Sequence, residues 1–270
     1  MSGLLRRFRR RKRYDFAPPR AAAVPEATQV KATIARLRRP ASDDPLYAHF
    51  QRNDRHNLHK WHHYFEIYNR FLARLRDRSH LRLLEIGVFR GGSLDLWRGY
   101  FHRDATIVGI DIDPSCKAFG HPERNIWVEV GDQSDAGFLK GVAAKYGPFD
   151  VIIDDGGHMT SQQIASFSAL YPEALTDDGV YLVEDLHTNY WRGFRDTKRS
   201  FVDLAKSLVD RLHEPYFGHE SELFFRAGDE KQLATLEVTR FCADTLAVSF
   251  FDSVIVFEKR RRSLPLSEIR

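Results

Sequence analysis

The alternation between short apolar runs and longer mixed segments, from Leu81 to Val183, constrains the fold most strongly. Five apolar runs have the length of strands, and the segments between them are long enough for crossover helices. They span residues 81–86, 106–110, 126–130, 149–153 and 180–183. Because strands buried on both faces of a parallel sheet read as nearly continuous apolar runs, the pattern predicts an α/β fold with a Rossmann-like, doubly wound parallel sheet.

The segments on either side of this alternation have other patterns. Near the C-terminus, apolar runs at 246–250 and 253–257 flank a short connection around Asp252, which predicts an antiparallel hairpin that closes the sheet. Between residues 55 and 78, apolar side chains recur every three or four residues, which predicts one amphipathic helix of roughly six turns. Its apolar stripe consists of Leu58, Trp61, Phe65, Tyr68, Phe71, Leu72 and Leu75.

The positive charge of the chain is concentrated at its N-terminus. Residues 1–40 hold 12 of the 41 basic residues and two acidic ones, so this stretch carries +10 and the other 230 residues carry −6. We therefore expect a solvated basic arm and linker at 1–44, a helical entry segment at 45–79, a Rossmann-like domain at 80–262 and a tail at 263–270. The arm could contact an anionic membrane surface, a polyanion or a partner, or act as a transit-like segment. The acidic folded part argues against nucleic acid.

Cysteine content and hydropathy indicate in which cellular compartment the protein functions. Cys116 and Cys242 are too few for a disulfide framework and lack zinc-site spacing. No stretch approaches 18 consecutive apolar residues, and no apolar segment of signal-peptide type follows the N-terminal charges. We expect a cytoplasmic protein.

Glycines and acids follow the first three predicted strands. The first strand runs into LLEIGVFRGGS, where Gly87 and Gly91 let backbone N–H groups approach a ligand at the start of a helix. The Gly-x-x-x-Gly-Gly spacing differs from that of a dinucleotide site, which disfavours NAD. The second strand ends at Asp111, where an acid can meet ribose hydroxyls, and the third ends before Asp132 and Gln133, beside an adenine edge.

These motifs resemble the class I S-adenosylmethionine-dependent methyltransferases, whose first motif is an acid followed by Gly-x-x-x-Gly, as in Glu85 to Gly91. The resemblance covers roughly residues 81–259 and includes the final hairpin. It implies S-adenosylmethionine as cofactor. The implied contacts are Glu85 in the first motif, Gly87, Gly91 and Asp154 at the methionine end, Asp111 at the ribose, and Asp132 and Gln133 at the adenine.

Two further motifs carry carboxylates. VIIDDGGH supplies Asp155, and YLVEDLHTNYW, about 30 residues later, supplies Glu184 and Asp185. Both follow strands that should be neighbours, so the three carboxylates should converge at one edge of the sheet. Their mutual repulsion would raise the pKa of one carboxylate or demand a cation, and oxygen ligands suit a hard ion such as Mg2+. His158, three residues beyond Asp155, is the candidate general base for an alcohol nucleophile.

This second pair of motifs resembles the metal-dependent sugar O-methyltransferases that act on macrolide deoxysugars and mycobacterial polysaccharides. The resemblance implies Asp155, Glu184 and Asp185 as Mg2+ ligands and His158 as the base. LHKWHHYFEIY resembles the entry helix of these enzymes, which implies Lys60, His63 and Tyr64 as pocket residues. Aromatic residues such as Tyr190 would stack on a sugar or fill the core.

We therefore expect Mg2+-assisted methyl transfer from S-adenosylmethionine to a hydroxyl of a saccharide or glycosylated metabolite. Two alternatives stay open. One is an enzyme with the same site, either a methyltransferase of catechol-like or other small diols or a relative of the cephalosporin hydroxylase cluster. The other is a non-catalytic Rossmann-like scaffold that docks through its basic arm. Because members of the family are commonly oligomeric, we expect a homo-oligomer.

Overall fold

The computed structural model describes residues 40–41, 43–217 and 237–263. Nearly all of the predicted basic arm and C-terminal tail lies outside these residues. The helices are α1 (Pro45–Gln51), α2 (His62–Leu72), α3 (Gly92–Tyr100), α4 (Ala136–Tyr146), α5 (Thr160–Ala174), α6 (Phe201–Arg211) and α8 (Arg240–Asp244). The 3-10 helices are η2 (Ala73–Leu75), η3 (Pro114–Phe119), η4 (Pro122–Arg124), η5 (Leu186–Tyr190) and η6 (Glu214–Tyr216). The strands are β1 (Arg82–Ile86), β2 (Thr106–Asp111), β3 (Ile126–Val130), β4 (Phe149–Asp154), β5 (Leu175–Val183), β6 (Thr245–Phe250) and β7 (Ile255–Lys259).

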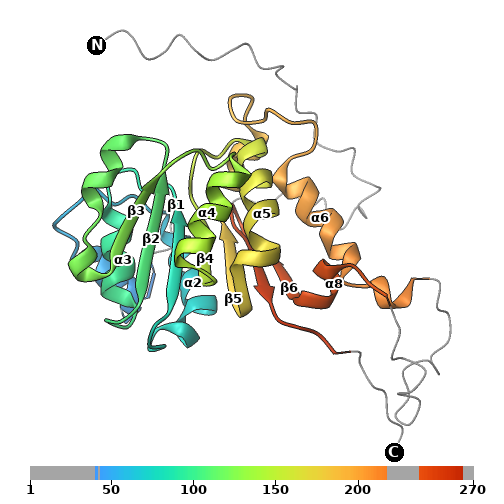
Figure 1. The fold of residues 1–270 in the computed structure, drawn as a ribbon, viewed down its shortest axis with the longest axis horizontal. Coiled ribbons are helices and arrows are strands. Elements are labelled where there is room, and N and C mark those ends of the chain that lie inside the picture. The colour runs from blue at the N-terminus through green and yellow to red at the C-terminus, as the bar shows by residue number, and fades with distance from the viewer. Residues whose placement is uncertain (1–39, 42, 218–236, 264–270) are drawn as a thin grey trace, which may run out of the picture.

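The seven strands form one sheet in the order β3-β2-β1-β4-β5-β7-β6 (Figure 1). Strands β1 to β5 are parallel, and β7 runs antiparallel to both β5 and β6. The doubly wound parallel sheet and the antiparallel C-terminal hairpin are thus confirmed. The strand order reverses between β1 and β4, and the crevice at the carboxyl ends of such strands is the usual ligand site of open α/β sheets.

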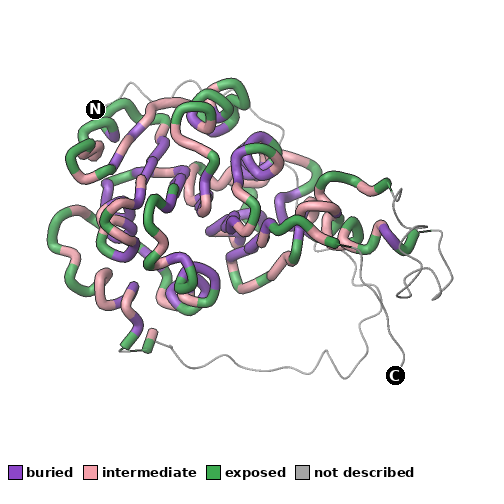
Figure 2. The backbone as a smooth tube through the Cα atoms, turned by 60° about the horizontal axis from the view of Figure 1, so that its bottom comes forward, coloured by how far each residue is buried: buried purple, intermediate pink, exposed green. Residues whose placement is uncertain are grey.

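Alternate residues of the central strands enter two separate cores. Leu83 and Ile153 pack with α1, α2 and α3 on one face of the sheet, whereas Leu84 and Ile152 pack with α4, α5 and α6 on the other. All four side chains are fully buried, and Figure 2 shows the buried residues concentrated in the middle of the molecule. Burial on both faces explains why these strands are almost continuously apolar.

The helix predicted over residues 55–78 is wrong in extent. Helix α2 begins at His62, Trp61 is the extended residue before it, and residues 52–61 form no helix. Two tertiary contacts hold this stretch out of a helix. The Lys60 side chain reaches into the sheet edge, and the Asn57 carbonyl lies so close to Gly92 that a Cβ there would come within 2.4 Å of it. Apolar residues that recur every three or four positions indicate which face is buried, but they do not indicate these contacts.

Two strand boundaries also differ from the prediction. Strand β5 begins at Leu175, five residues earlier than expected, because Leu175 already pairs with Phe149. Strand β7 starts at Ile255 rather than at residue 253, because Ser253 has a φ of +65° and belongs to the turn. Among the described residues, none of the helices combines the length and apolar character that a membrane crossing requires.

Candidate active site

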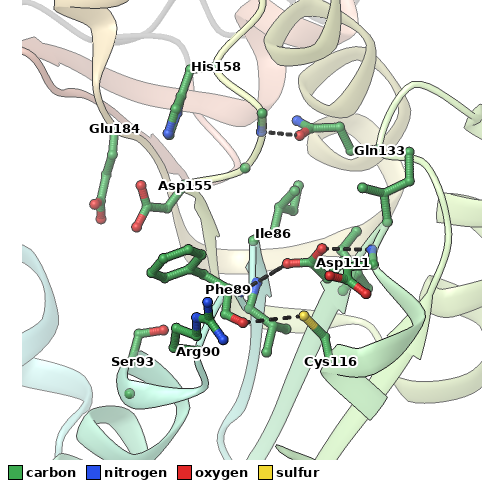
Figure 3. Close-up of a pocket in the computed structure, with 18 of the residues that line it drawn as sticks. Ile86, Phe89, Arg90, Ser93, Asp111, Cys116, Gln133, Asp155, His158 and Glu184 are labelled. Carbon is green, nitrogen blue, oxygen red and sulfur yellow. Dashed lines mark hydrogen bonds between the residues drawn. The ribbon is translucent and has the colours of Figure 1, made fainter. Parts of the chain in front are cut away.

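A cavity of about 720 Å³ lies at the carboxyl ends of the central strands (Figure 3). Loops after β1, β2, β3, β4 and β5 line it, and residues 57–61 form another part of its wall. The cavity therefore occupies the crevice that the reversal of strand order creates, and its volume lies in the range of small-molecule sites.

Two glycines are required by the backbone of the loop after β1. Gly87 has a φ of +97°, and a Cβ there would lie 2.2 Å from the Asp155 carbonyl oxygen. Gly91, the residue before α3, has a φ of +77°, and its Cβ would lie 2.6 Å from the Phe119 ring. Only glycine satisfies both demands, so the loop after β1 packs directly on the loop after β4.

Glu85 stabilises the wall of the cavity through hydrogen bonds to helix α3. Its carboxylate is fully buried and accepts hydrogen bonds from Ser93 Oγ at 2.6 Å and Trp97 Nε1 at 3.0 Å. Burial raises the pKa of Glu85 to about 7. Because both partners lie on α3, Glu85 fixes this helix against β1 and is not among the residues that line the cavity.

Asp111 lines the cavity and also organises its glycine loop. Its Oδ2 accepts hydrogen bonds from the backbone N–H groups of Val88 and Phe89, each at 2.9 Å, and its Oδ1 accepts one from Asp113 N (Figure 3). Phe89 has a φ of +51°, lines the cavity and is 71% exposed as a residue. Such a strained, exposed aromatic residue is typical of a functional loop.

The remaining predicted cofactor residues divide into two groups. Asp132 and Gln133 line the cavity. Gln133 also accepts a hydrogen bond from Gly157 N at 2.7 Å and donates one to Asp154 Oδ1 at 3.2 Å. Asp154 itself is buried and accepts a hydrogen bond from Ser166 Oγ, and burial raises its pKa to about 6. It therefore supports Gln133 from beneath rather than lining the cavity.

Asp155, His158 and Asp185 converge at one side of the cavity. One ligand atom from each lies within 4.8 Å of the others, as in a metal-binding group, and His158 Nε2 lies 3.6 Å from Asp185 Oδ2. His158 and Asp185 both have positive φ values, +57° and +54°. This uncommon backbone geometry directs both side chains into one space. His158 Nδ1 is buried and has no hydrogen-bond partner among the described residues.

Lys60 bridges two of the predicted metal ligands. Its Nζ lies 2.6 Å from Asp155 Oδ2 and 2.8 Å from Glu184 Oε2, and Tyr68 donates a 2.5 Å hydrogen bond to Glu184 Oε1. Burial alone would lower the pKa of Lys60, but the two carboxylates outweigh it and hold that pKa above its ordinary value. Burial raises the pKa of Glu184, against the attraction of Lys60. The structure thus groups His158 with Asp155 and Asp185, while Glu184 joins them through Lys60.

The predicted substrate residues lie at different distances from this cluster. Lys60 and Tyr64 line the cavity, and Tyr64 Oη donates a 2.7 Å hydrogen bond to Asp185 Oδ1. His63 lies outside, with Nε2 3.2 Å from the Asp252 carbonyl oxygen. Tyr190 ends η5 and is half exposed, and it is not among the lining residues.

Sequence reasoning missed three buried residues: Tyr68 and Gln163, which contact Glu184, and Asn189, which contacts Gln163. Tyr68 is one turn after Tyr64, and its place in the apolar stripe concealed its polar role. Gln163 donates a 3.4 Å hydrogen bond to the Glu184 carbonyl oxygen, and Asn189 donates one at 2.8 Å to Gln163. No motif marks Gln163 or Asn189, because their role depends on the packing of α5 against η5.

The chain is similar in sequence to curated sugar O-methyltransferases, although no family model matches it. It is 39% identical over 172 residues to 8-demethyl-8-alpha-L-rhamnosyl tetracenomycin-C 2'-O-methyltransferase of Streptomyces olivaceus, covering 59% of this chain and 44% of the relative. It is also 39% identical over 178 residues to demethylmacrocin O-methyltransferase of Streptomyces fradiae, covering 60% and 44%. The chain thus spans less than half the length of these relatives.

A solved structure extends the likeness to the fold. The MycE methyltransferase of the mycinamycin biosynthetic pathway, in complex with Mg, SAH and mycinamycin VI, superposes with a TM-score of 0.65 at 27% sequence identity. The match covers 86% of this chain and 56% of MycE. The class I methyltransferase fold and the resemblance to sugar O-methyltransferases are therefore confirmed.

Proposed function

We propose that this protein transfers a methyl group from S-adenosylmethionine to a hydroxyl of a saccharide or glycosylated metabolite, with the help of Mg2+. The observation that carries the proposal is the convergence of Asp155, His158 and Asp185 beside a glycine-loop cavity. The relatives support the same chemistry, because their names describe methylation of sugar hydroxyls and MycE was solved with Mg and SAH. They favour a saccharide over a catechol-like diol.

We assign the cofactor to the half of the cavity formed by the loops after β1, β2 and β3. Asp111 faces this half from the end of β2, where an acid suits ribose hydroxyls, while Asp132 and Gln133 lie at the end of β3. Gly87 and Gly91 leave room for a close approach to the backbone. Glu85 and Asp154 stabilise this half from inside the protein.

The residues at the other half fit a hard divalent cation. Asp155 and Asp185 supply oxygen ligands within reach of one another, and Glu184 completes the acidic set. In this arrangement Lys60 offers one positive charge to Asp155 and Glu184. We propose that Lys60 keeps these carboxylates in place until Mg2+ takes over part of the neutralisation.

His158 is suited to accept the proton of the acceptor hydroxyl. When bound, Mg2+ would acidify that hydroxyl, and S-adenosylmethionine would supply the methyl group. Asp185 Oδ2 lies 3.6 Å from His158 Nε2 and would help to orient the imidazole. Tyr64 donates to the same carboxylate and holds it in position. The proton passes to His158 as the methyl carbon leaves sulfur for oxygen, a step that depends on alignment.

The test is transfer of radiolabelled methyl groups from S-adenosylmethionine to a panel of glycosides, with Mg2+ and after chelation. Transfer should require the metal. Asp155→Asn and Asp185→Asn should abolish it while leaving cofactor binding intact, and His158→Ala should slow it by about 100- to 10,000-fold. Full activity after chelation, or in the Asp155 variant, would refute the metal assignment.

We place this reaction in the cytoplasm, because Cys116 and Cys242 are both buried free thiols, as in a reducing compartment. The homo-oligomer and the contact of the basic arm with a membrane or polyanion stay predictions.

A further inference from the structure

Five aromatic side chains form a continuous arc beside the carboxylate cluster. Centroids lie 5.4 Å apart between Trp61 and His187, 4.7 Å between His187 and Trp191, 6.0 Å between Trp191 and Phe194, and 6.4 Å between Phe194 and His158. The arc joins three segments of the chain, namely the stretch before α2, the loop before α5 and the region around η5.

The two indole rings in the arc are unusually accessible. Trp61 is 48% exposed and Trp191 is 52% exposed, whereas Trp97 is fully buried and donates its N–H to Glu85. Large aromatic surfaces cost free energy when they remain in water, at about 25 cal/mol per Å² of apolar area. Neither Trp61 nor Trp191 belongs to the two cores, so packing in the cores does not account for them.

The aromatic arc lies at the half of the cavity that holds the carboxylates. Trp61 and His158, its two ends, both line the cavity. Trp61 follows Lys60, which contacts Asp155, and His187 lies two residues after Asp185. The proposed cofactor half is lined instead by the loops after β1 to β3. A ring resting on the arc would therefore lie beside the carboxylates and leave the cofactor half free.

We propose that Trp61, His187 and Trp191 form a stacking subsite for the pyranose ring of the acceptor. A pyranose has one face of C–H groups and a rim of hydroxyls, so the aromatic rings would cover the apolar face and the rim would point toward Asp155 and Asp185. A sugar that lacks a ring hydroxyl offers a larger apolar face and should bind better than a fully hydroxylated one. The subsite rests on the proposed function and deepens it, since it assigns the substrate class to named residues.

The test uses methyl α-L-rhamnopyranoside as probe, with the full chain saturated with Mg2+. In the wild type, the probe should quench tryptophan fluorescence saturably, because the indoles of Trp61 and Trp191 are accessible. Trp61→Ala and Trp191→Ala should each weaken probe binding and raise KM for the glycoside about tenfold. Turnover number should change less, and S-adenosylmethionine affinity should remain that of the wild type. Trp61→Phe should recover most of the affinity.

Trp127→Phe is the matched control. Trp127 lies on β3 and packs at 6.0 Å from Tyr146, on the face of the sheet that carries α4. This variant should keep both the probe affinity and KM of the wild type.

The two proposals fail in different ways. Saturable quenching that Trp61→Ala and Trp191→Ala weaken, without methyl transfer to any glycoside, would support the subsite and refute the proposed function. Methyl transfer with an unchanged KM in both alanine variants would support the function and refute the subsite. Absence of both quenching and transfer in the wild type would refute both.

Discussion

Replacement of Lys60 by methionine tests the charge balance at the centre of the site. The Lys60 side chain is 2% exposed, and its ammonium lies within 2.8 Å of both Asp155 and Glu184. Methionine keeps most of the volume of the lysine stem and removes the charge. Asp155 and Glu184 would then face each other across a buried space without a cation.

The expected cost follows from the burial of this group. Removing one partner of a buried ion pair typically costs about 3–5 kcal/mol, because the remaining charge stays uncompensated. In a chain of this size, that loss lowers the melting temperature by about 5–10 °C. The pair of Lys145 and Glu129, 2.7 Å apart, supplies the control, since Lys145 is exposed and Lys145→Met should leave the melting temperature nearly unchanged.

The assay is thermal unfolding of the wild type and both variants, with Mg2+ and after chelation. If Asp155 and Glu184 hold the ion, Mg2+ should replace the missing charge and raise the melting temperature of Lys60→Met more than that of the wild type. The reasoning is wrong if Lys60→Met melts like the wild type after chelation, or if Mg2+ stabilises the three proteins equally.

Three further changes have defined outcomes. Glu85→Gln should flatten the pH dependence of stability. Because the pKa of Glu85 is raised in the folded protein, the wild type should lose about 3 kcal/mol of unfolding free energy as the pH rises from 4.5 to 7. Urea unfolding at several pH values measures this loss. Gly87→Ala should lower affinity for S-adenosylmethionine in calorimetry, since its Cβ would collide with the Asp155 carbonyl; wild-type affinity would contradict the close packing of the loops. Asn189→Ala removes the hydrogen-bond partner of Gln163 Oε1 and of Val202 N. It should lower the free energy of urea unfolding by about 2 kcal/mol or more. A loss below about 0.5 kcal/mol would exclude a supporting role for Asn189.

Much of the fold could be predicted because the central strands are buried on both faces. Leu83 and Leu84 are adjacent in sequence, yet each enters a different core, so the strand reads as one apolar run. Crossover helices between such runs leave few topologies. The helix over residues 55–78 was mispredicted because an apolar period records only which side chains are buried. It cannot record that Lys60 reaches into the sheet edge.

The site was predictable to the extent that strand ends determine it. Asp111, Asp155 and Asp185 follow strands that meet at one edge, so their approach follows from topology. The bridging by Lys60 and the support from Asn189 depend on side-chain packing between distant segments. The backbone geometry could not be predicted either, because the positive φ of Asp185 is a property of the turn after β5 rather than of any motif.

Calorimetric titration of S-adenosylmethionine into the purified protein tests the central claim most directly. We expect saturable binding both with Mg2+ and after chelation, because the loops after β1 to β3 assigned to the cofactor are separate from the carboxylates assigned to the metal. Asp155→Asn should retain this binding. Absence of saturable heat from the folded wild-type protein in both conditions would contradict the assignment of a methyltransferase.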